Sequence, residues 1–362
     1  MRVLTVGDGD LSYSLNLLRT ERRARREGGR RLVLVASTLD SRVELLRRYG
    51  PQVAATMAEL DGGEDVRGEL AGTGPVLSRF VPGVDATRLA ATLGAGERGV
   101  VERGDATRRR YRNRRGVHFL DWLLTLGPAA EASCFDRIDW LFPHTGKQKI
   151  QTQRLLLRDF FVSAASHLRP HGTIRVALAQ GQGGTPMESV QRKPADSWQV
   201  VEAAAYGGLV LCAVAPFVDP GGCYRPTGRR NTSSAFNTRS SLMHHFALPQ
   251  RRAPAVSLYP PTYAHDVSFW WPAEGGNSFG SSSLSAWLRR VVCDVAGEDR
   301  VVRVEQVERY VPPASAEGER SRVGLTFRVV YQDPAEALSR AAAAALQAEV
   351  RLQLGLMGVE LR

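Results

Sequence analysis

The sequence predicts an α/β fold with a doubly wound, mostly parallel sheet, followed by a smaller α+β domain. Short apolar strands alternate with amphipathic helices about seven times in the first part of the chain, a pattern typical of a parallel sheet with helices on both faces. The last part follows the order strand, helix, strand, strand, helix, strand. At 362 residues the chain is also long for one core. We expect 1–235 to form the first domain, 236–256 a linker and 257–362 the second domain.

The chain begins with a strand, a glycine turn and a helix. Three of residues 3–6 are apolar, residues 7–10 read Gly-Asp-Gly-Asp, and Ser12 caps a helix that runs to Leu18. The glycines let the backbone approach a ligand, and the helix start offers free N–H groups. The two carboxylates would repel a pyrophosphate but suit the ammonium and sulfonium of S-adenosylmethionine. The turn is neither a P-loop nor a full dinucleotide fingerprint, and an ordinary tight turn is the alternative.

The second and third strands are each followed by an acidic residue. Residues 31–36 form a buried strand, and Asp40 lies where a carboxylate commonly binds ribose hydroxyls. A cap for the helix 41–49 is an equally good interpretation of Asp40. Residues 51–74 read as a helix and a glycine-rich loop. A short strand over 79–87 places Asp85 and Ala86 where an adenine ring would lie.

The fourth strand and its exit loop cover 134–146. Pro143 stops the strand and Gly146 frees the turn. Because the carboxyl edge of a doubly wound sheet holds the ligand, this loop should face the glycine turn and place His144 beside a substrate base. A structural histidine held by hydrogen bonds is the alternative.

The remaining elements are predicted from the same periodicity. In the first domain a helix over 151–168, closed by 169–172, precedes a strand over 173–179, a glycine loop over 181–184, a helix over 198–207 and a strand over 209–217. In the second domain a strand opens at residue 259, a helix covers 284–295, strands cover 301–310 and 322–331, a helix covers 335–354 and a last strand covers 358–362.

The charge of the chain favours a polyanionic partner. The formal net charge is +11 and the pI is near 10.0, and the excess lies in residues 1–256, which carry +13. Arginines cluster at 19–31 and 98–115, although an arginine-rich composition can also reflect genome base composition. We expect structured RNA, either rRNA or tRNA, or ribosomal particles as partners. The candidate RNA-binding residues are Arg108, Arg109, Arg110, Arg112, Arg114 and Arg115.

Cysteine spacing and hydropathy narrow the remaining classes. The four cysteines, Cys134, Cys212, Cys223 and Cys293, have no C-x-x-C spacing, so we predict free thiols and no metal site. The sequence contains no run of 18 apolar residues and no apolar signal segment. We therefore expect no membrane association and an intracellular protein of the cytoplasm or nucleolus, with the mitochondrion as a further location.

Several spaced motifs together resemble a known family. The series V-G-D-G-D-L-S-Y-S-L, A-S-T-L-D-S, V-D-A-T and F-D-R-I-D-W-L-F-P-H-T-G resembles the Rossmann-like domain of rRNA uridine-N3 methyltransferases over roughly residues 1–230. The resemblance implies S-adenosylmethionine as cofactor. It carries cofactor roles to Gly7, Asp8, Gly9, Asp10, Ser12, Asp40, Asp85 and Ala86, and base-side or catalytic roles to Phe142, Pro143 and His144.

The sequence departs from the family motif at one position, and the end of the chain resembles a second family. The family usually reads F-N-F-P-H, and Leu141 stands at the asparagine position, where it cannot hydrogen-bond a pyrimidine. The last hundred or so residues resemble the ferredoxin-fold anticodon-binding domain of phenylalanyl-tRNA synthetase, with His265 in place of the usual arginine. The combination of both domains in one chain resembles animal proteins that contain a ferredoxin-fold anticodon-binding domain.

Three functions fit these patterns. The first is methyl transfer from S-adenosylmethionine to a base nitrogen of structured RNA, of the uridine-N3 type in rRNA, with His144 removing the weakly acidic N–H proton. The second is a non-catalytic RNA-binding ribosome-assembly factor that keeps the fold, and Leu141 favours it. The third, a tRNA-binding protein, rests on fold analogy.

Overall fold

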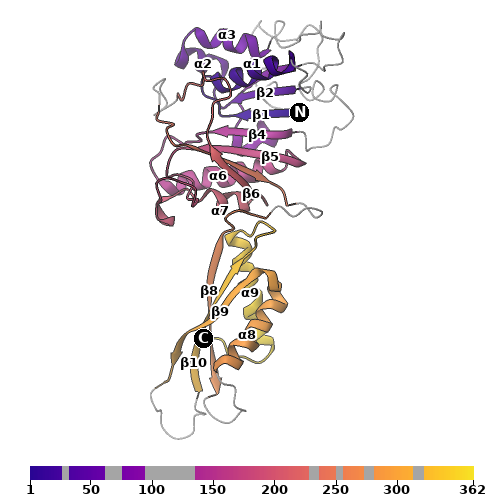
Figure 1. Cartoon of the computed structure of the whole chain (residues 1–362). Coiled ribbons are helices and arrows are strands. Elements are labelled where there is room, and N and C mark those ends of the chain that lie inside the picture. Colours follow the sequence, from indigo (N-terminus) through magenta and orange to yellow (C-terminus); the bar gives the residue numbers. More distant parts are fainter. Residues whose placement is uncertain are drawn as a thin grey trace, which may run out of the picture. The chain divides into compact units, whose positions relative to one another are not determined.

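The computed structural model describes residues 1–26, 32–61, 76–93, 135–227, 236–249, 256–272, 281–312 and 322–362. These residues form two compact units, Met1–Leu258 and Tyr259–Arg362, and Figure 1 labels most of their helices and strands. Within these ranges no helix is long and apolar enough to cross a bilayer.

A seven-stranded sheet forms the centre of the first unit, in the order β3-β2-β1-β4-β5-β7-β6. Strands β1 to β5 pair in parallel, whereas β7 runs antiparallel to both of its neighbours. The strands are β1 (Arg2–Val6), β2 (Leu32–Thr38), β3 (Val76–Pro82), β4 (Phe135–Leu141), β5 (Leu168–Leu178), β6 (Val210–Pro216) and β7 (Leu242–Ala247). The order reverses between β1 and β4, and ligands of open α/β sheets bind beyond the carboxyl ends of strands at such a point.

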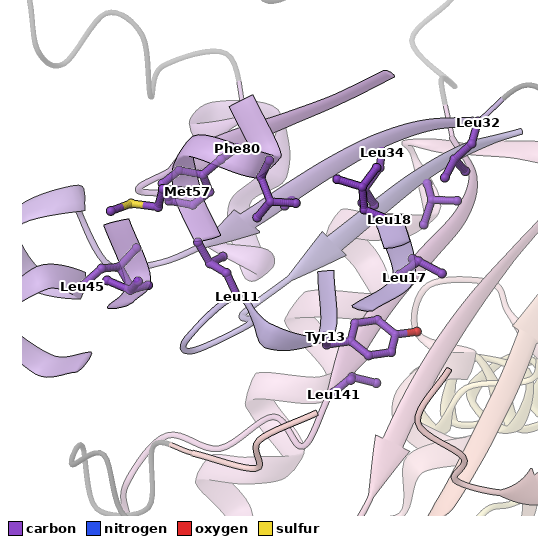
Figure 2. Packing of buried hydrophobic residues seen from close by; sticks show 14 of the residues in the cluster. Leu11, Tyr13, Leu17, Leu18, Leu32, Leu34, Leu45, Met57, Phe80 and Leu141 are labelled. Atoms are coloured by element: carbon purple, nitrogen blue, oxygen red, sulfur yellow. The ribbon is translucent and has the colours of Figure 1, made fainter. Parts of the chain in front are cut away.

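Helices cover both faces of this sheet, as the strand and helix alternation predicts. On one face Leu18 of α1 and Met57 of α3 belong to the same apolar cluster as Leu34 of β2 (Figure 2). On the other face Phe160 of α6 packs on Trp140 of β4, with ring centroids 4.4 Å apart. The helices are α1 (Ser12–Arg26), α2 (Arg42–Tyr49), α3 (Gln52–Asp61), η2 (Ala86–Arg88), α4 (Leu89–Thr92), α6 (Ile150–Ala165), η4 (Pro194–Asp196) and α7 (Val200–Ala205).

Two segments differ from their expected structure. Residues 242–247, expected in a linker, form β7 inside the sheet, where His244 and Phe246 are fully buried. Two adjacent histidines interrupt the apolar run, so the sequence does not read as a strand. Residues 169–172, expected to close a helix, lie in β5, because α6 already ends at Ala165.

The second unit has the predicted βαββαβ order. Its antiparallel sheet is ordered β8-β10-β9, and Leu361 bridges Phe269 at the free side of β8. The predicted last strand is thus a single bridge. The ring of Phe269 stacks on Phe327, with centroids 5.7 Å apart, in the core beneath the helices. The elements are β8 (Thr262–Pro272), α8 (Ser281–Ala296), η6 (Glu298–Arg300), β9 (Val301–Tyr310), β10 (Arg322–Gln332) and α9 (Arg340–Leu356).

One buried carboxylate connects three elements of the first unit. The side chain of Asp139 in β4 has no exposed surface. Arg175 of β5 donates hydrogen bonds to its two oxygens at 2.7 and 2.5 Å, and the Tyr13 hydroxyl of α1 donates another at 2.9 Å. Burial raises the pKa of Asp139, but the Arg137 and Arg175 guanidiniums and the hydrogen bonds outweigh burial and hold it below its ordinary value. The carboxylate is therefore ionised at neutral pH.

We expect Asp139→Ala to destabilise the first unit by about 3–5 kcal/mol, because it leaves the largely buried Arg175 charge without its partner. Glu59→Ala is the matched control. Its ion pair with Arg19 lies on the surface, and such pairs contribute about 1 kcal/mol or less. Urea unfolding followed by circular dichroism measures both variants. Equal destabilisation of the two would contradict a special role for the buried pair.

Candidate cofactor and substrate site

The glycine turn leaves β1 at the centre of the carboxyl edge. Gly7 has a φ of +63°, and a Cβ there would lie 2.4 Å from Nε1 of Trp140, so both backbone conformation and space require glycine. At Gly9 a Cβ would lie 2.8 Å from the Tyr49 hydroxyl. Val6 pairs with Trp140 across the β1–β4 junction, and therefore the turn and the exit loop of β4 start side by side.

Asp8 holds the start of helix α1 in place. Its Oδ2 accepts hydrogen bonds from the Ser14 backbone N–H at 2.7 Å and the Ser14 hydroxyl at 2.6 Å. Burial, with a smaller contribution from the neighbouring Asp10 charge, raises the pKa of Asp8 to about 7. The Asp8 carboxylate, predicted to bind the cofactor, thus points toward helix α1 and accepts its hydrogen bonds from Ser14 of that helix.

Asp10 and Ser12 line a cavity of about 360 Å³ between α1, the start of α3 and residues 223–227. Asp10 accepts one hydrogen bond, from the Ser12 backbone N–H at 3.1 Å. Helix α1 thus begins at Ser12 with Asp10 as its acceptor, whereas the sequence predicted a serine cap. Of the predicted cofactor residues, only Asp10 and Ser12 line this cavity.

Asp40 follows β2 and is already paired. Arg48 of α2 donates to its carboxylate at 2.6 Å. Burial raises the pKa of Asp40, and the Arg48 charge partly offsets that rise. The interpretation of Asp40 as a helix cap is wrong, because Ser41 caps α2 in a capping box with Glu44. The ribose role stays a prediction, and it would require Asp40 to be shared with Arg48.

Asp85 and Ala86 lie beyond β3, which ends at Pro82. The Asp85 carboxylate accepts hydrogen bonds from the backbone N–H and the hydroxyl of Thr87, at 2.9 and 2.7 Å, and so caps η2. Ala86 is buried. Their predicted role beside an adenine ring is left open by these contacts.

The exit loop of β4 starts with an unusual backbone conformation. Phe142 has a φ of +49°, in the left-handed region that bulky residues rarely adopt. Its ring contacts Phe217, Tyr224 and Phe236, with centroids 5.2, 6.1 and 5.0 Å away. Pro143 is buried. These aromatic contacts hold the loop in the strained conformation.

His144 is exposed, and its hydrogen bond decides its chemistry. The Gly146 backbone N–H donates to its Nδ1 at 2.7 Å, so the neutral imidazole carries its proton on Nε2. Partial burial lowers the pKa of His144, which keeps the ring neutral at physiological pH. The free ring position is thus a donor. This geometry suits His144 to donate to a carbonyl oxygen, and its predicted role in removing a proton stays a prediction.

Gln153 is a site residue that the motifs did not reveal. It lies in α6, is 2% exposed, and holds the loop after His144. Its Oε1 accepts from the Thr145 N–H at 3.1 Å, and its Nε2 donates to the Lys147 carbonyl at 2.6 Å. The available signal was a glutamine on the apolar stripe that Leu157 and Phe160 continue.

Residues 217–227 form a covering segment over the glycine turn, which the sequence analysis also missed. The Arg225 backbone N–H donates to the Ser12 hydroxyl at 3.0 Å, and the Thr20 hydroxyl donates to the Pro220 carbonyl at 3.1 Å. The Tyr224 ring lies edge-on to Tyr13, with centroids 6.1 Å apart. A segment about 200 positions away in sequence therefore completes the site.

Other predicted features have simpler outcomes. Among the described cysteines, Cys212, Cys223 and Cys293 are free thiols, as predicted. No group of three potential metal ligands occurs in the described ranges. The candidate RNA-binding residues, Arg108, Arg109, Arg110, Arg112, Arg114 and Arg115, lie outside the described residues, as does Cys134.

The strand order with its antiparallel β7, together with a glycine turn at the β1–β4 junction, defines a Rossmann-like methyltransferase domain. The chain belongs to the BMT5-like family, described as rRNA (uridine-N3-)-methyltransferase BTM5-like, whose model matches residues 4–220. The family description names an rRNA methyltransferase, an enzyme class whose methyl donor is S-adenosylmethionine. The Asp10 carboxylate, which has no ion-pair partner among the described residues, lies beside a cavity and fits that cationic cofactor, whereas Asp40 is already paired with Arg48.

Two curated proteins match shorter stretches. Ferredoxin-fold anticodon-binding domain-containing protein 1 of Homo sapiens is 43% identical over 114 residues, which cover 31% of this chain and 18% of that protein. Its Mus musculus homolog is 40% identical over 141 residues, which cover 38% of this chain and 22% of that protein. The matches thus span about a fifth of the length of these relatives.

Solved structures match part of the chain at low identity and with TM-scores below 0.5. The 16S rRNA methyltransferase KamB is 14% identical, with 68% of this chain and 88% of that chain covered and a TM-score of 0.34. A variant of the 16S rRNA (adenine(1408)-N(1))-methyltransferase from Catenulisporales acidiphilia, with cosubstrate SAM, is 13% identical, with 70% and 88% covered and a TM-score of 0.35. The assignment of the first unit to a Rossmann-like methyltransferase domain therefore rests on the strand order and the family match.

We expect the protonated Asp8 carboxyl to contribute stability that is lost as the pH rises from about 4 to 7. Its pKa is raised from 3.8 to about 7, so the folded state binds a proton that the unfolded state releases. The contribution is at most about 1.4 kcal/mol per pH unit. Asp8→Asn should flatten this part of the profile in urea unfolding, whereas Asp159→Asn, a control at a half-exposed carboxylate, should not. If the pH dependence of stability were the same in Asp8→Asn and the wild type, the raised pKa of Asp8 would be contradicted.

Proposed function

We propose that this protein methylates N3 of a uridine in ribosomal RNA. The observation that carries the proposal is the family match over residues 4–220. It is supported by His144, which follows the strand next to the glycine turn and offers a hydrogen-bond donor. Because the chain matches about a fifth of its curated relatives, the activity and partners of the whole protein, including ribosomal particles or tRNA, belong to the proposal too.

His144 would stabilise charge on the base. When bound, S-adenosylmethionine supplies an electrophilic methyl group. Uracil N3 lies between two carbonyl groups, so release of its proton to solvent spreads negative charge onto both oxygens. The Nε2–H of His144 would donate to one of them, and Gln153 would hold the loop that presents it. Such a donor acts without reorganisation in the transition state.

The target base must leave its stack to reach this loop, at a cost of about a few kcal/mol. We propose that phosphate binding by the arginine-rich part of the chain offsets that cost. Replacing the six predicted RNA-binding arginines by Ala should flatten the salt dependence of RNA binding by ~0.7 to 0.9 in log–log slope for each phosphate that is no longer neutralised. Filter binding from 50 to 200 mM salt measures it. If the salt dependence of RNA binding did not change, these arginines would not be the RNA-binding residues. The residues replaced are Arg108, Arg109, Arg110, Arg112, Arg114 and Arg115.

We expect His144→Ala to lower methyl transfer to rRNA by about 100- to 1,000-fold, the usual effect of removing one such donor. His144→Gln is the informative partner, because an amide donates a hydrogen bond but cannot accept a proton as a general base. It should keep activity within about tenfold of the wild type. Transfer of radiolabelled methyl groups, followed by mass spectrometry of N3-methyluridine, measures both variants.

The controls separate three outcomes. Calorimetric binding of S-adenosylmethionine should be the same in both variants. An equal drop in activity in His144→Ala and His144→Gln would assign His144 to proton removal after all. A wild-type protein that binds the cofactor but methylates no rRNA would contradict the proposed function and favour the assembly-factor hypothesis.

A further inference from the structure

The cavity beside the glycine turn carries one acidic and one basic side chain that are otherwise unpaired. Within the described part of the chain, neither Asp10 nor Arg225 belongs to an ion pair. Arg19 lines the same cavity, but Glu59 already accepts two hydrogen bonds from its guanidinium, at 3.0 and 2.7 Å. The charges available to a ligand are therefore one carboxylate and one guanidinium.

The cavity also has a buried polar atom without a partner. Asn16 lines it and is 5% exposed, and its side-chain Nδ2 makes no hydrogen bond to any described residue. An unsatisfied buried amide costs about 1–3 kcal/mol in general. The other polar side chains of the lining include those of Ser12, Tyr49, Gln52, Thr56 and Thr227. This set can satisfy a small ligand with several polar atoms.

Arg225 is held beside Asp10 by the backbone. Its N–H donates to the hydroxyl of Ser12, two positions after Asp10, at 3.0 Å. The covering segment thus brings its own cation to the acidic glycine turn. The volume of about 360 Å³ lies within the range of small-molecule sites.

We infer that this cavity binds the α-amino-acid end of the methyl donor, with Asp10 on the ammonium and Arg225 on the carboxylate. A phosphate would be repelled by Asp10, and a simple cation by Arg225, whereas a zwitterion satisfies both. Asn16 supplies a further donor for the carboxylate. The inference rests on the proposed function, since it concerns the cofactor of that reaction, and it adds Arg225 and Asn16 to the site.

Two nucleoside probes test the inference in the full-length protein. S-adenosylhomocysteine has the amino-acid end, and 5′-methylthioadenosine lacks it. By calorimetry the wild type should bind the first at least about tenfold more tightly, as expected for charge-assisted hydrogen bonds. Arg225→Gln and Asp10→Asn should each weaken S-adenosylhomocysteine binding by about tenfold or more and leave 5′-methylthioadenosine binding unchanged. Arg225→Lys should retain part of the preference.

Arg290→Gln is the matched control, because it makes the same charge change at an exposed position of the second unit. It should change neither affinity. Equal wild-type affinity for the two probes, or an equal weakening of both in Arg225→Gln, would overturn the inference and leave the proposed function standing. If the wild type bound neither probe nor S-adenosylmethionine, the proposed function would fail as well.

Discussion

The relative position of the glycine turn and the β4 exit loop depends on the carboxylate of Asp139. It lies two residues before the end of β4, and Tyr13 reaches it from the first turn of α1. Arg175 offsets part of the desolvation cost from β5. A buried pair of this kind adds little net stability compared with apolar packing, but it tolerates only one arrangement of its three elements. We therefore attribute to it the register in which the turn meets the loop.

Four aspartates near the carboxyl edge show how one residue type takes different roles. Asp8 is buried against α1 and has a pKa near neutrality. Asp40 is paired with Arg48, and Asp85 caps η2. Asp10 alone among these four lines the cavity. The acidic pattern of the sequence thus contains structural carboxylates and one that is available to a cationic ligand.

Local pattern predicted most of the fold, and long-range contacts explain what it missed. The strands β1 to β6 and the order of the second unit follow from apolar periodicity and punctuation by glycine and proline. β7 was not predicted because His244 and His245 interrupt its apolar residues. The covering segment and Gln153 were not predicted for another reason. Their roles depend on partners that are distant in the sequence or that lie outside their own element. The arrangement of site residues in space was therefore less predictable than the elements that carry them.

The tautomer of His144 matters because Leu141 stands at the position where the resembled family usually has asparagine. Leu141 is 8% exposed and packs in the apolar cluster that includes Tyr13 and Leu11 (Figure 2). An asparagine there would bury an amide among apolar groups unless the covering segment moved. In this chain position 141 therefore serves packing. Under the proposed function, the polar contact to a base would be made by the exposed loop. His144 provides a donor there because Gly146 occupies its other nitrogen. Absence of the amide at position 141 is thus compatible with chemistry at N3, provided that the histidine acts as a donor.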